Sequence, residues 1–186
     1  MKTLLVPVSS AVVAILMLTP GMTAQSPQSP LARKADVLYI PTPQPVVDSM
    51  LELADVKADD VVFDLGSGDG RIVITAAKKY GATGVGIEID PALVQRARTN
   101  AERAGVADRV RFVSEDLFTT DLSGASVVTL YLLQSLNERL RPKLVRELKP
   151  GARVVSHVFN MGPEWPPDRT VSLNGSRIFL WSIPNR

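Results

Sequence analysis

From Thr42 onward, the chain alternates between two patterns of apolar positions. Short apolar runs predict buried strands, and longer segments whose apolar residues recur at helical spacing predict amphipathic helices. The first helix, for example, is predicted with Thr42 as its cap and Pro43 at its first position. Strands are predicted at 60–65, 84–89, 110–114, 126–133 and 153–159, and helices at 43–54, 71–80, 91–104 and 135–148, the last of them kinked or divided at Pro142.

The last two predicted strands, 169–173 and 177–183, flank Asn174-Gly175, which is the strongest short signal for a hairpin. The earlier strands alternate with helices, and this order implies a parallel sheet that is covered on both faces. The pattern therefore predicts one α/β domain over residues 38–186. Its sheet is expected to be twisted and mostly parallel, with helices on both faces and a C-terminal antiparallel hairpin.

The first 37 residues follow a different pattern. Lys2 is the only charged side chain before Arg33, and an apolar run over 4–18 is followed by small or polar residues. This is the layout of a secretory signal, and the run is shorter than the roughly 20 residues that a spanning helix needs. Residues 1–24 are therefore predicted to be a signal peptide or a membrane anchor, and the Ser- and Pro-rich residues 25–37 a linker. The protein is accordingly expected to be exported or membrane-associated, with the side of the membrane left open.

Charge and composition exclude several classes of function. The 21 Lys and Arg residues nearly balance the 19 Asp and Glu residues, so the formal net charge of +2 gives no electrostatic reason to expect a nucleic-acid partner. The chain has no Cys and a single His, His157. This composition excludes disulfides, thiolate catalysis, Cys-ligated zinc and multi-His metal sites, so no metal site is predicted.

A glycine-rich loop, Asp64-Leu65-Gly66-Ser67-Gly68-Asp69-Gly70, lies between a predicted strand and a predicted helix. Glycines let the backbone turn sharply and let a ligand approach closely. The spacing is G-x-G-x-G rather than G-x-G-x-x-G, and the Gly-Lys-Ser/Thr of a P-loop is absent. Carboxylates at Asp64 and Asp69 would oppose a pyrophosphate but attract a cation. The loop therefore favours S-adenosylmethionine (SAM), which carries an ammonium and a sulfonium, although Asp69 could instead only cap the helix.

Two further acids stand at the ends of the next two predicted strands. Glu88 lies 24 residues after Asp64, close to where an acid binds a ribose diol in nucleotide-binding folds. Asp116 follows the third strand and could accept from an adenine amino group. Acids after three successive parallel strands meet at the carboxyl edge of the sheet, where ligands bind. The sequence therefore predicts an adenosine-containing cation at this edge.

Several segments resemble known SAM-binding motifs. DLGSGDGR at 64–71, GIEID at 86–90 and EDLF at 115–118 are similar to the three SAM motifs of class I methyltransferases, which implies their Rossmann-like fold. YIPTP at 39–43, together with GDGRIVI and VGIEIDP, resembles more specifically a family of small membrane-associated lysine methyltransferases. Mitochondrial members of that family act on the ATP synthase c subunit and the adenine nucleotide carrier.

The resemblance implies which residues contact the cofactor. It implies that the segment from Tyr39 to Thr42 folds over SAM and that residues of the three motifs contact SAM. The candidate cofactor residues are Tyr39, Thr42, Asp64, Gly66, Ser67, Gly68, Asp69, Glu88, Asp116 and Leu117.

The acceptor side is less clearly marked. Tyr131, near the end of the fourth strand, is the candidate catalytic residue, although a tyrosine there more often belongs to the core. The strand lacks the N-P-P-Y or D-P-P-Y sequence of enzymes that methylate base amino groups or glutamine amides. His157, near the end of the fifth strand, is interpreted as a hydrogen-bonded structural residue rather than a general base.

The predicted function is SAM-dependent methylation of a protein lysine. Two alternatives remain at this level: a small-molecule methyltransferase on the same fold, and an exported binding protein that keeps the fold without catalysis. The expected partners are a protein substrate and, through the N-terminal segment, a membrane.

Overall fold

The computed structural model describes residues 39–184, which fold into a seven-stranded sheet with four helices. The helices are α1 (Gln44–Leu53), α2 (Arg71–Tyr80), α3 (Pro91–Ala104) and α4 (Gln134–Glu147). The strands are β1 (Val61–Leu65), β2 (Thr83–Glu88), β3 (Val110–Ser114), β4 (Val127–Leu130), β5 (Arg153–His157), β6 (Arg169–Leu173) and β7 (Ser176–Ser182).

The sheet has the strand order β3-β2-β1-β4-β5-β7-β6. The first five strands pair in parallel, whereas β7 pairs antiparallel with both β5 and β6. The order reverses beside β1, so the ends of β1 and β4 flank a topological switch point, where ligands bind in open α/β sheets. The predicted class, a mostly parallel sheet with a C-terminal antiparallel hairpin, is confirmed. Asn174 and Gly175 both have positive φ, 51° and 82°, as the predicted tight turn between β6 and β7 requires.

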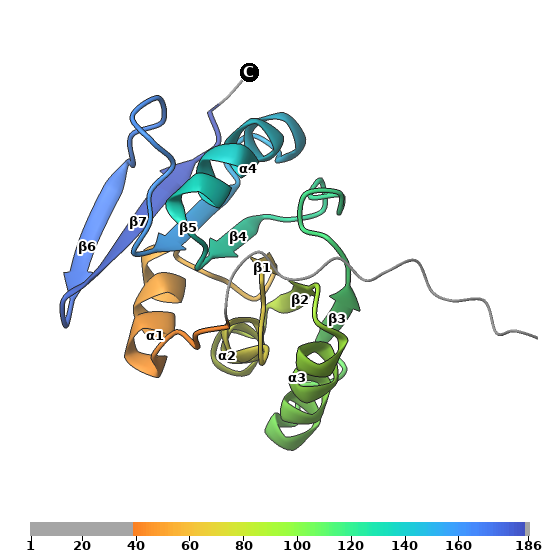
Figure 1. Cartoon of the computed structure of the whole chain (residues 1–186). Helices are drawn as coiled ribbons and strands as arrows, with labels where there is room; N and C mark the ends of the chain where they lie inside the picture. Colours follow the sequence, from red (N-terminus) through yellow and green to blue (C-terminus); the bar gives the residue numbers. More distant parts are fainter. Residues whose placement is uncertain (1–38, 185–186) are drawn as a thin grey trace, which may run out of the picture. The chain divides into compact units, whose positions relative to one another are not determined.

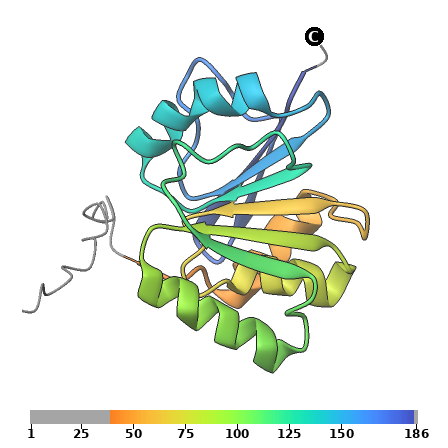
Figure 2. The same cartoon turned by 90° about the vertical axis from the view of Figure 1, so that its right-hand side faces the viewer.

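Helices cover both faces of the sheet, as the alternating pattern predicted (Figures 1 and 2). α1, α2 and α3 pack on one face, where Val47, Ile72 and Val155 belong to one buried cluster. α4 packs on the other face, where Leu140 and Trp181 belong to the second cluster. Burial of these apolar side chains is the main force that holds the helices on the sheet.

The structure corrects several features of the predicted elements. Pro43, not Thr42, is the N-terminal cap of α1, and no side chain caps this helix. Thr42 lies one residue further out, is 4% exposed, and its carbonyl accepts a hydrogen bond from Arg71. β4 ends at Leu130, before Tyr131, and β5 ends at His157 because Val158 takes a positive φ of 68°, which no strand accommodates. α4 runs through Pro142 without division.

The predicted signal or anchor over 1–24 and the predicted linker over 25–37 lie outside the described residues. Within 39–184, no helix has the length and apolar character that crossing a bilayer demands.

Candidate cofactor site

The glycine loop joins β1 to α2 and is fastened to the neighbouring strand. The backbone N–H groups of Gly66 and Ser67 both donate to the carbonyl of Ile87, at 2.9 and 3.0 Å. Gly68 has a φ of +53°, and a Cβ added there would lie 2.3 Å from a ring carbon of Tyr39. Only glycine therefore allows Tyr39 to lie against the loop in this way.

Three carboxylates stand at the carboxyl ends of adjacent strands, as the sequence predicted. Asp64 lies near the end of β1, Glu88 ends β2, and Asp116 follows β3. Glu88 is 7% exposed, and its two oxygens accept one backbone N–H each, from Gly68 at 2.9 Å and from Asp90 at 3.0 Å. These bonds fix the carboxylate against the loop and leave its remaining lone pairs available to a diol.

Asp64 is the most deeply buried of these acids, with 3% of its surface exposed. Burial, together with the charges of Glu88 and Asp69, raises its pKa to about 7, against the effect of a hydrogen bond from the Thr129 hydroxyl at 2.7 Å. A buried carboxylate with this pKa favours a cationic partner, because a positive charge would offset the cost of ionising it.

Asp69 is engaged by a neighbouring arginine. Its carboxylate accepts from Nε of Arg71 at 2.9 Å and from Nη2 at 2.7 Å. Burial alone would raise the pKa of Asp69, but these bonds outweigh burial and hold the pKa below its usual value. Asp69 is therefore ionised and already paired, so its charge is largely neutralised within the protein. Gly70, not Asp69, is the N-terminal cap of α2, but Asp69 also accepts from the backbone N–H of Arg71 at 3.3 Å, at the start of this helix.

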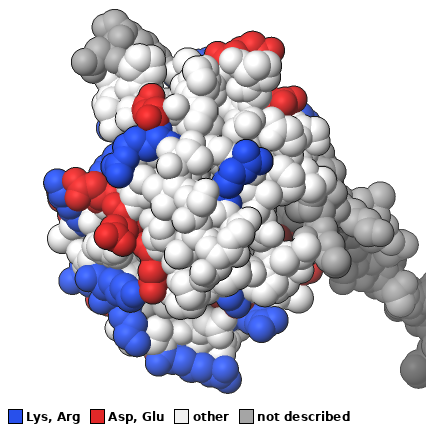
Figure 3. Space-filling view, turned by 90° about the vertical axis from the view of Figure 1, so that its left-hand side faces the viewer, with Lys and Arg blue, Asp and Glu red and all other residues white. Residues whose placement is uncertain are grey.

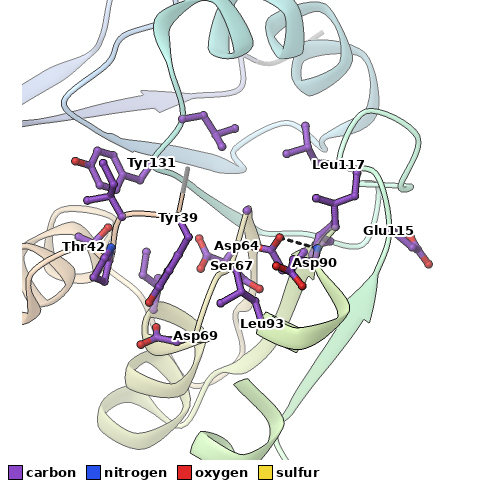
Figure 4. A pocket seen from close by; sticks show the side chains of 18 of the residues that line it. Tyr39, Thr42, Asp64, Ser67, Asp69, Asp90, Leu93, Glu115, Leu117 and Tyr131 are labelled. Atoms are coloured by element: carbon purple, nitrogen blue, oxygen red, sulfur yellow. Dashed lines mark hydrogen bonds between the residues drawn. The ribbon is translucent and has the colours of Figure 1, made fainter. Parts of the chain in front are cut away.

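A cavity of about 750 Å³ opens at this edge of the sheet (Figure 4). This volume lies within the usual range for small-molecule sites. The predicted residues that line it are Tyr39, Thr42, Asp64, Gly66, Ser67, Asp69, Glu88, Asp116, Leu117 and Tyr131. Gly68 is the one candidate outside the lining, since it lies beneath Tyr39 and donates to Glu88. The structure thus brings the predicted set together around one space.

The two ends of the cavity differ in chemistry. Figure 4 shows Leu117 and Glu115 at one end, and Tyr131 and Thr42 at the opposite end. The carboxylates of Asp64, Glu88 and Asp116 follow the edge from β1 to β3. Beyond β1, the lining contributed after β4 is aromatic and apolar: Tyr131, Leu132 and Leu136.

The sequence did not single out several other residues of the lining, and most of them are apolar. They are Ile40, Pro41, Arg71, Ile72, Ile87, Ile89, Asp90, Pro91, Leu93, Glu115, Phe118, Leu132 and Leu136. Many stand next to a predicted acid, as Ile89 does beside Glu88, so adjacency was the available signal. Arg71 ends the motif at 64–71, but its contact with Thr42 could not be predicted, because Thr42 lies 29 residues away.

The residues present fit SAM. The hydroxyl oxygen of Ser67 is buried in the loop without a hydrogen-bond partner among residues 39–184, and a bound ligand would supply one. The acids match the ammonium, the sulfonium and the diol, and the apolar lining matches a purine. Among the described residues, no group of three or more His, Asp or Glu is arranged to hold a metal ion.

Comparison with known proteins defines the class. A crystal structure of an RNA methyltransferase from Salinibacter ruber, in complex with S-adenosyl-L-homocysteine (SAH), superposes with a TM-score of 0.78. It is 62% identical in sequence, and the match covers 79% of this chain and 95% of that one. The protein is a class I SAM-dependent methyltransferase, with SAM as its cofactor.

The family is also defined. Residues 64–169 match the model of the ANTKMT methyltransferase domain, and the chain belongs to this family. A protein-lysine N-methyltransferase from Saccharolobus islandicus is 49% identical over 138 residues, which cover 74% of this chain and 85% of that protein. A human lysine N-methyltransferase, named for the ATP synthase c subunit, is 37% identical over 140 residues. The match covers 75% of this chain but only 59% of the human protein.

Proposed function

We propose that this methyltransferase modifies lysine side chains of proteins. The proposal rests on the chemistry of the end of the cavity that lies after β4, which is called the acceptor end from here on. The chain leaves β4 through Tyr131 and Leu132, and with Leu136 of α4 these residues give this end an aromatic and apolar wall. An amide or a base amino group needs polar partners to be activated, whereas a lysine amine only has to be neutral.

An apolar wall promotes that neutral state. A lysine amine has an ordinary pKa of about 10.4, and desolvation together with a nearby positive charge lowers it. The neutral nitrogen attacks the methyl carbon in line, the new C–N bond forms as the C–S bond breaks, and SAH leaves. The methylated ammonium then loses a proton to solvent. The protein's contribution is to align the amine with the methyl group and to exclude water.

We infer the following cofactor contacts from the geometry. Glu88 accepts from the ribose hydroxyls, because two backbone N–H groups already hold its oxygens in place. Asp116 lies at the adenine end, beside the apolar side chain of Leu117. Asp64 faces the cationic methionine part of SAM. Tyr39 and Thr42 belong to the segment 39–43, called the strap from here on, which forms one wall of the cavity.

The names of the relatives point to different acceptors. The Saccharolobus islandicus relative is named for protein lysine and the Salinibacter ruber structure for RNA. The face that carries α1 and the β6–β7 hairpin shows Lys and Arg beside Asp and Glu, without a continuous basic surface (Figure 3). RNA-binding surfaces gather positive charge on one face, and this face does not carry such a surface.

Methyl transfer from tritiated SAM tests the proposal directly. The purified full chain is incubated with cell protein and, separately, with total RNA, and hydrolysed protein is analysed for methyl-lysines. We expect the label in methyl-lysine, lost in Asp64→Ala and retained in Asp108→Asn, an exposed substitution away from the cavity. Label in RNA that is sensitive to ribonuclease, or in a soluble metabolite, would refute the lysine proposal.

We also propose that residues 1–24 direct the protein to a membrane or across it, on the strength of their apolar run after Lys2. Fractionation with protease protection tests this. A full chain recovered entirely in the soluble cytosolic fraction, with an intact N-terminus, would contradict the targeting role.

A further inference from the structure

Two unusual features lie together at the carboxyl end of β5. His157 is 2% exposed, and neither of its ring nitrogens has a hydrogen-bond partner among residues 39–184. Buried polar atoms without partners cost free energy and are rare in proteins. The hydrogen bonds expected for His157 are therefore not found among residues 39–184.

The next residue, Val158, adopts a φ of 68°, in the left-handed region that β-branched residues avoid. Its N–H donates to the carbonyl of Arg177 at 2.7 Å, and the following residue is held by Asn137, whose side-chain amide donates to the carbonyl of Phe159 at 3.0 Å. Backbone strain of this kind persists where the surroundings enforce it, and it gathers at functional sites.

The contact that His157 does make is with Tyr131. The two rings lie with centroids 4.2 Å apart and planes tilted by 44°. β4 and β5 pair in parallel with Leu130 opposite Ser156. The next residues of the two chain segments, Tyr131 and His157, therefore lie side by side at the same edge of the sheet. Tyr131 lines the cavity, whereas His157 is not among its lining residues and stands behind the Tyr131 ring.

The order of the strands indicates which part of SAM meets Tyr131. Asp116 follows β3 and Glu88 ends β2, so the adenine and ribose contacts proposed above lie on one side of β1. β4 lies on the other side of β1, where Tyr131 and the apolar wall are found. The sulfonium and its methyl group therefore face the end of β4.

We propose that His157 is a positioning residue for methyl transfer, whose imidazole ring supports the Tyr131 ring against the reacting methyl group. Tyr131, held in place by this contact, forms the aromatic wall past which the lysine amine reaches the methyl. Naming lysine as the acceptor rests on the proposed function, but the support of Tyr131 by His157 does not.

Burial lowers the pKa of His157, which keeps the imidazole neutral and adds no positive charge beside the sulfonium. An aromatic face attracts a cation, so a well-placed Tyr131 favours SAM over the uncharged sulfur of SAH.

The test measures the affinities of SAM and SAH for the full chain by isothermal titration calorimetry, with no acceptor present. We expect His157→Ala to weaken SAM by about threefold to tenfold more than SAH, because the freed Tyr131 ring no longer holds its place beside the cation. His157→Phe keeps a flat ring behind Tyr131 and removes both unpaired nitrogens. It should therefore retain the wild-type ratio of the two affinities and melt at a higher temperature. A purely structural role would change both affinities together and leave their ratio intact.

His157→Leu replaces His157→Ala if the latter folds poorly, because it fills the site without a flat ring and should show the same shift in the ratio. A double substitution then checks that the effect acts through Tyr131. In a Tyr131→Leu background, His157→Phe and His157→Ala should have the same SAM-to-SAH ratio, since the supported ring is gone. A wild-type ratio in His157→Ala, or an equal loss of the ratio in His157→Phe and His157→Ala, would overturn the positioning role. A failed lysine assay with a ratio that shifts as expected would reject the acceptor and leave the positioning role in place.

Discussion

Arg71 fastens Thr42 to the glycine loop. Its Nη1 donates to the carbonyl of Thr42 at 2.9 Å, while Nε and Nη2 hold the carboxylate of Asp69. One side chain at the start of α2 thus joins the strap to the loop across the cavity wall. The same contacts neutralise the charge of Asp69, which the sequence assigns to the cofactor site.

Replacing Arg71 by Met should weaken SAM binding by about tenfold to a hundredfold. Each lost hydrogen bond to a charged group is worth roughly 1.5–3 kcal/mol, and about 1.4 kcal/mol is a factor of ten in affinity. The loss also frees the strap, because the carbonyl of Thr42 no longer has its donor. Arg71→Lys keeps the charge without the planar fork and should be intermediate. Calorimetric titration with SAM measures the effect.

Arg103→Met provides the matched control, because Arg103 is exposed in the last turn of α3, away from the cavity. It should bind SAM as the wild type does. Wild-type affinity in Arg71→Met would mean that the strap and the loop do not cooperate in binding.

SAM affinity should increase as the pH rises through about 7. Burial keeps Asp64 half-protonated near that pH in the free protein, and a cationic ligand binds the ionised form. Each pH unit below the pKa should cost up to about a factor of ten, as for any single linked proton. Titrations between pH 5.5 and 8.5 with wild type and Asp64→Asn measure this, and the variant should bind weakly with no slope from this group. An equal slope in both proteins would assign the proton to another group.

Asp64→Asn should also stabilise the SAM-free protein at pH 8. Folding raises the pKa of Asp64, so the folded state binds this proton more tightly than the unfolded chain does. Its contribution to stability is therefore greatest in acid and is lost as the pH rises from the ordinary carboxyl value to about 7. Asn is uncharged and can still accept from the Thr129 hydroxyl. Thermal unfolding followed by circular dichroism should show a higher melting temperature at pH 8 and a much smaller gain at pH 5; a lower melting temperature at pH 8 would contradict this.

Gly68→Ala should displace the strap. The new methyl group would meet the ring of Tyr39 at 2.3 Å, and the backbone would keep a positive φ that costs roughly 1–2 kcal/mol for a residue with a Cβ. We expect a lower melting temperature and weaker SAM binding.

Removing the ring separates the two causes. The double variant with Tyr39→Ala relieves the clash and leaves the φ strain, so the effects of the two substitutions on stability should not add. Strict additivity would show that Tyr39 does not pack on Gly68 in solution.

The order of strands and helices could be predicted because it depends on local spacing of apolar residues. The strand-end acids could be predicted as neighbours for a similar reason: carboxyl ends of parallel strands meet at one edge, so Asp64, Glu88 and Asp116 follow from the order alone. The ends of the strands and helices were predicted less accurately than their order. β5 ends at His157, because Val158 adopts a left-handed conformation that is not a preference of valine, and the Val158 N–H donates to the carbonyl of Arg177.

The sequence by itself therefore determined the fold class, the glycine loop and the acids that make this edge suitable for SAM. Only the tertiary structure decided how those acids are used. The charge of Asp69 is neutralised by Arg71, and burial raises the pKa of Asp64 to about 7. It also decided that Thr42 serves the strap rather than capping a helix, and that His157 stands behind Tyr131. The physical reason is that spacing along the chain encodes periodicity and strand order. A pKa and a side-chain contact depend instead on which groups distant in sequence are buried together.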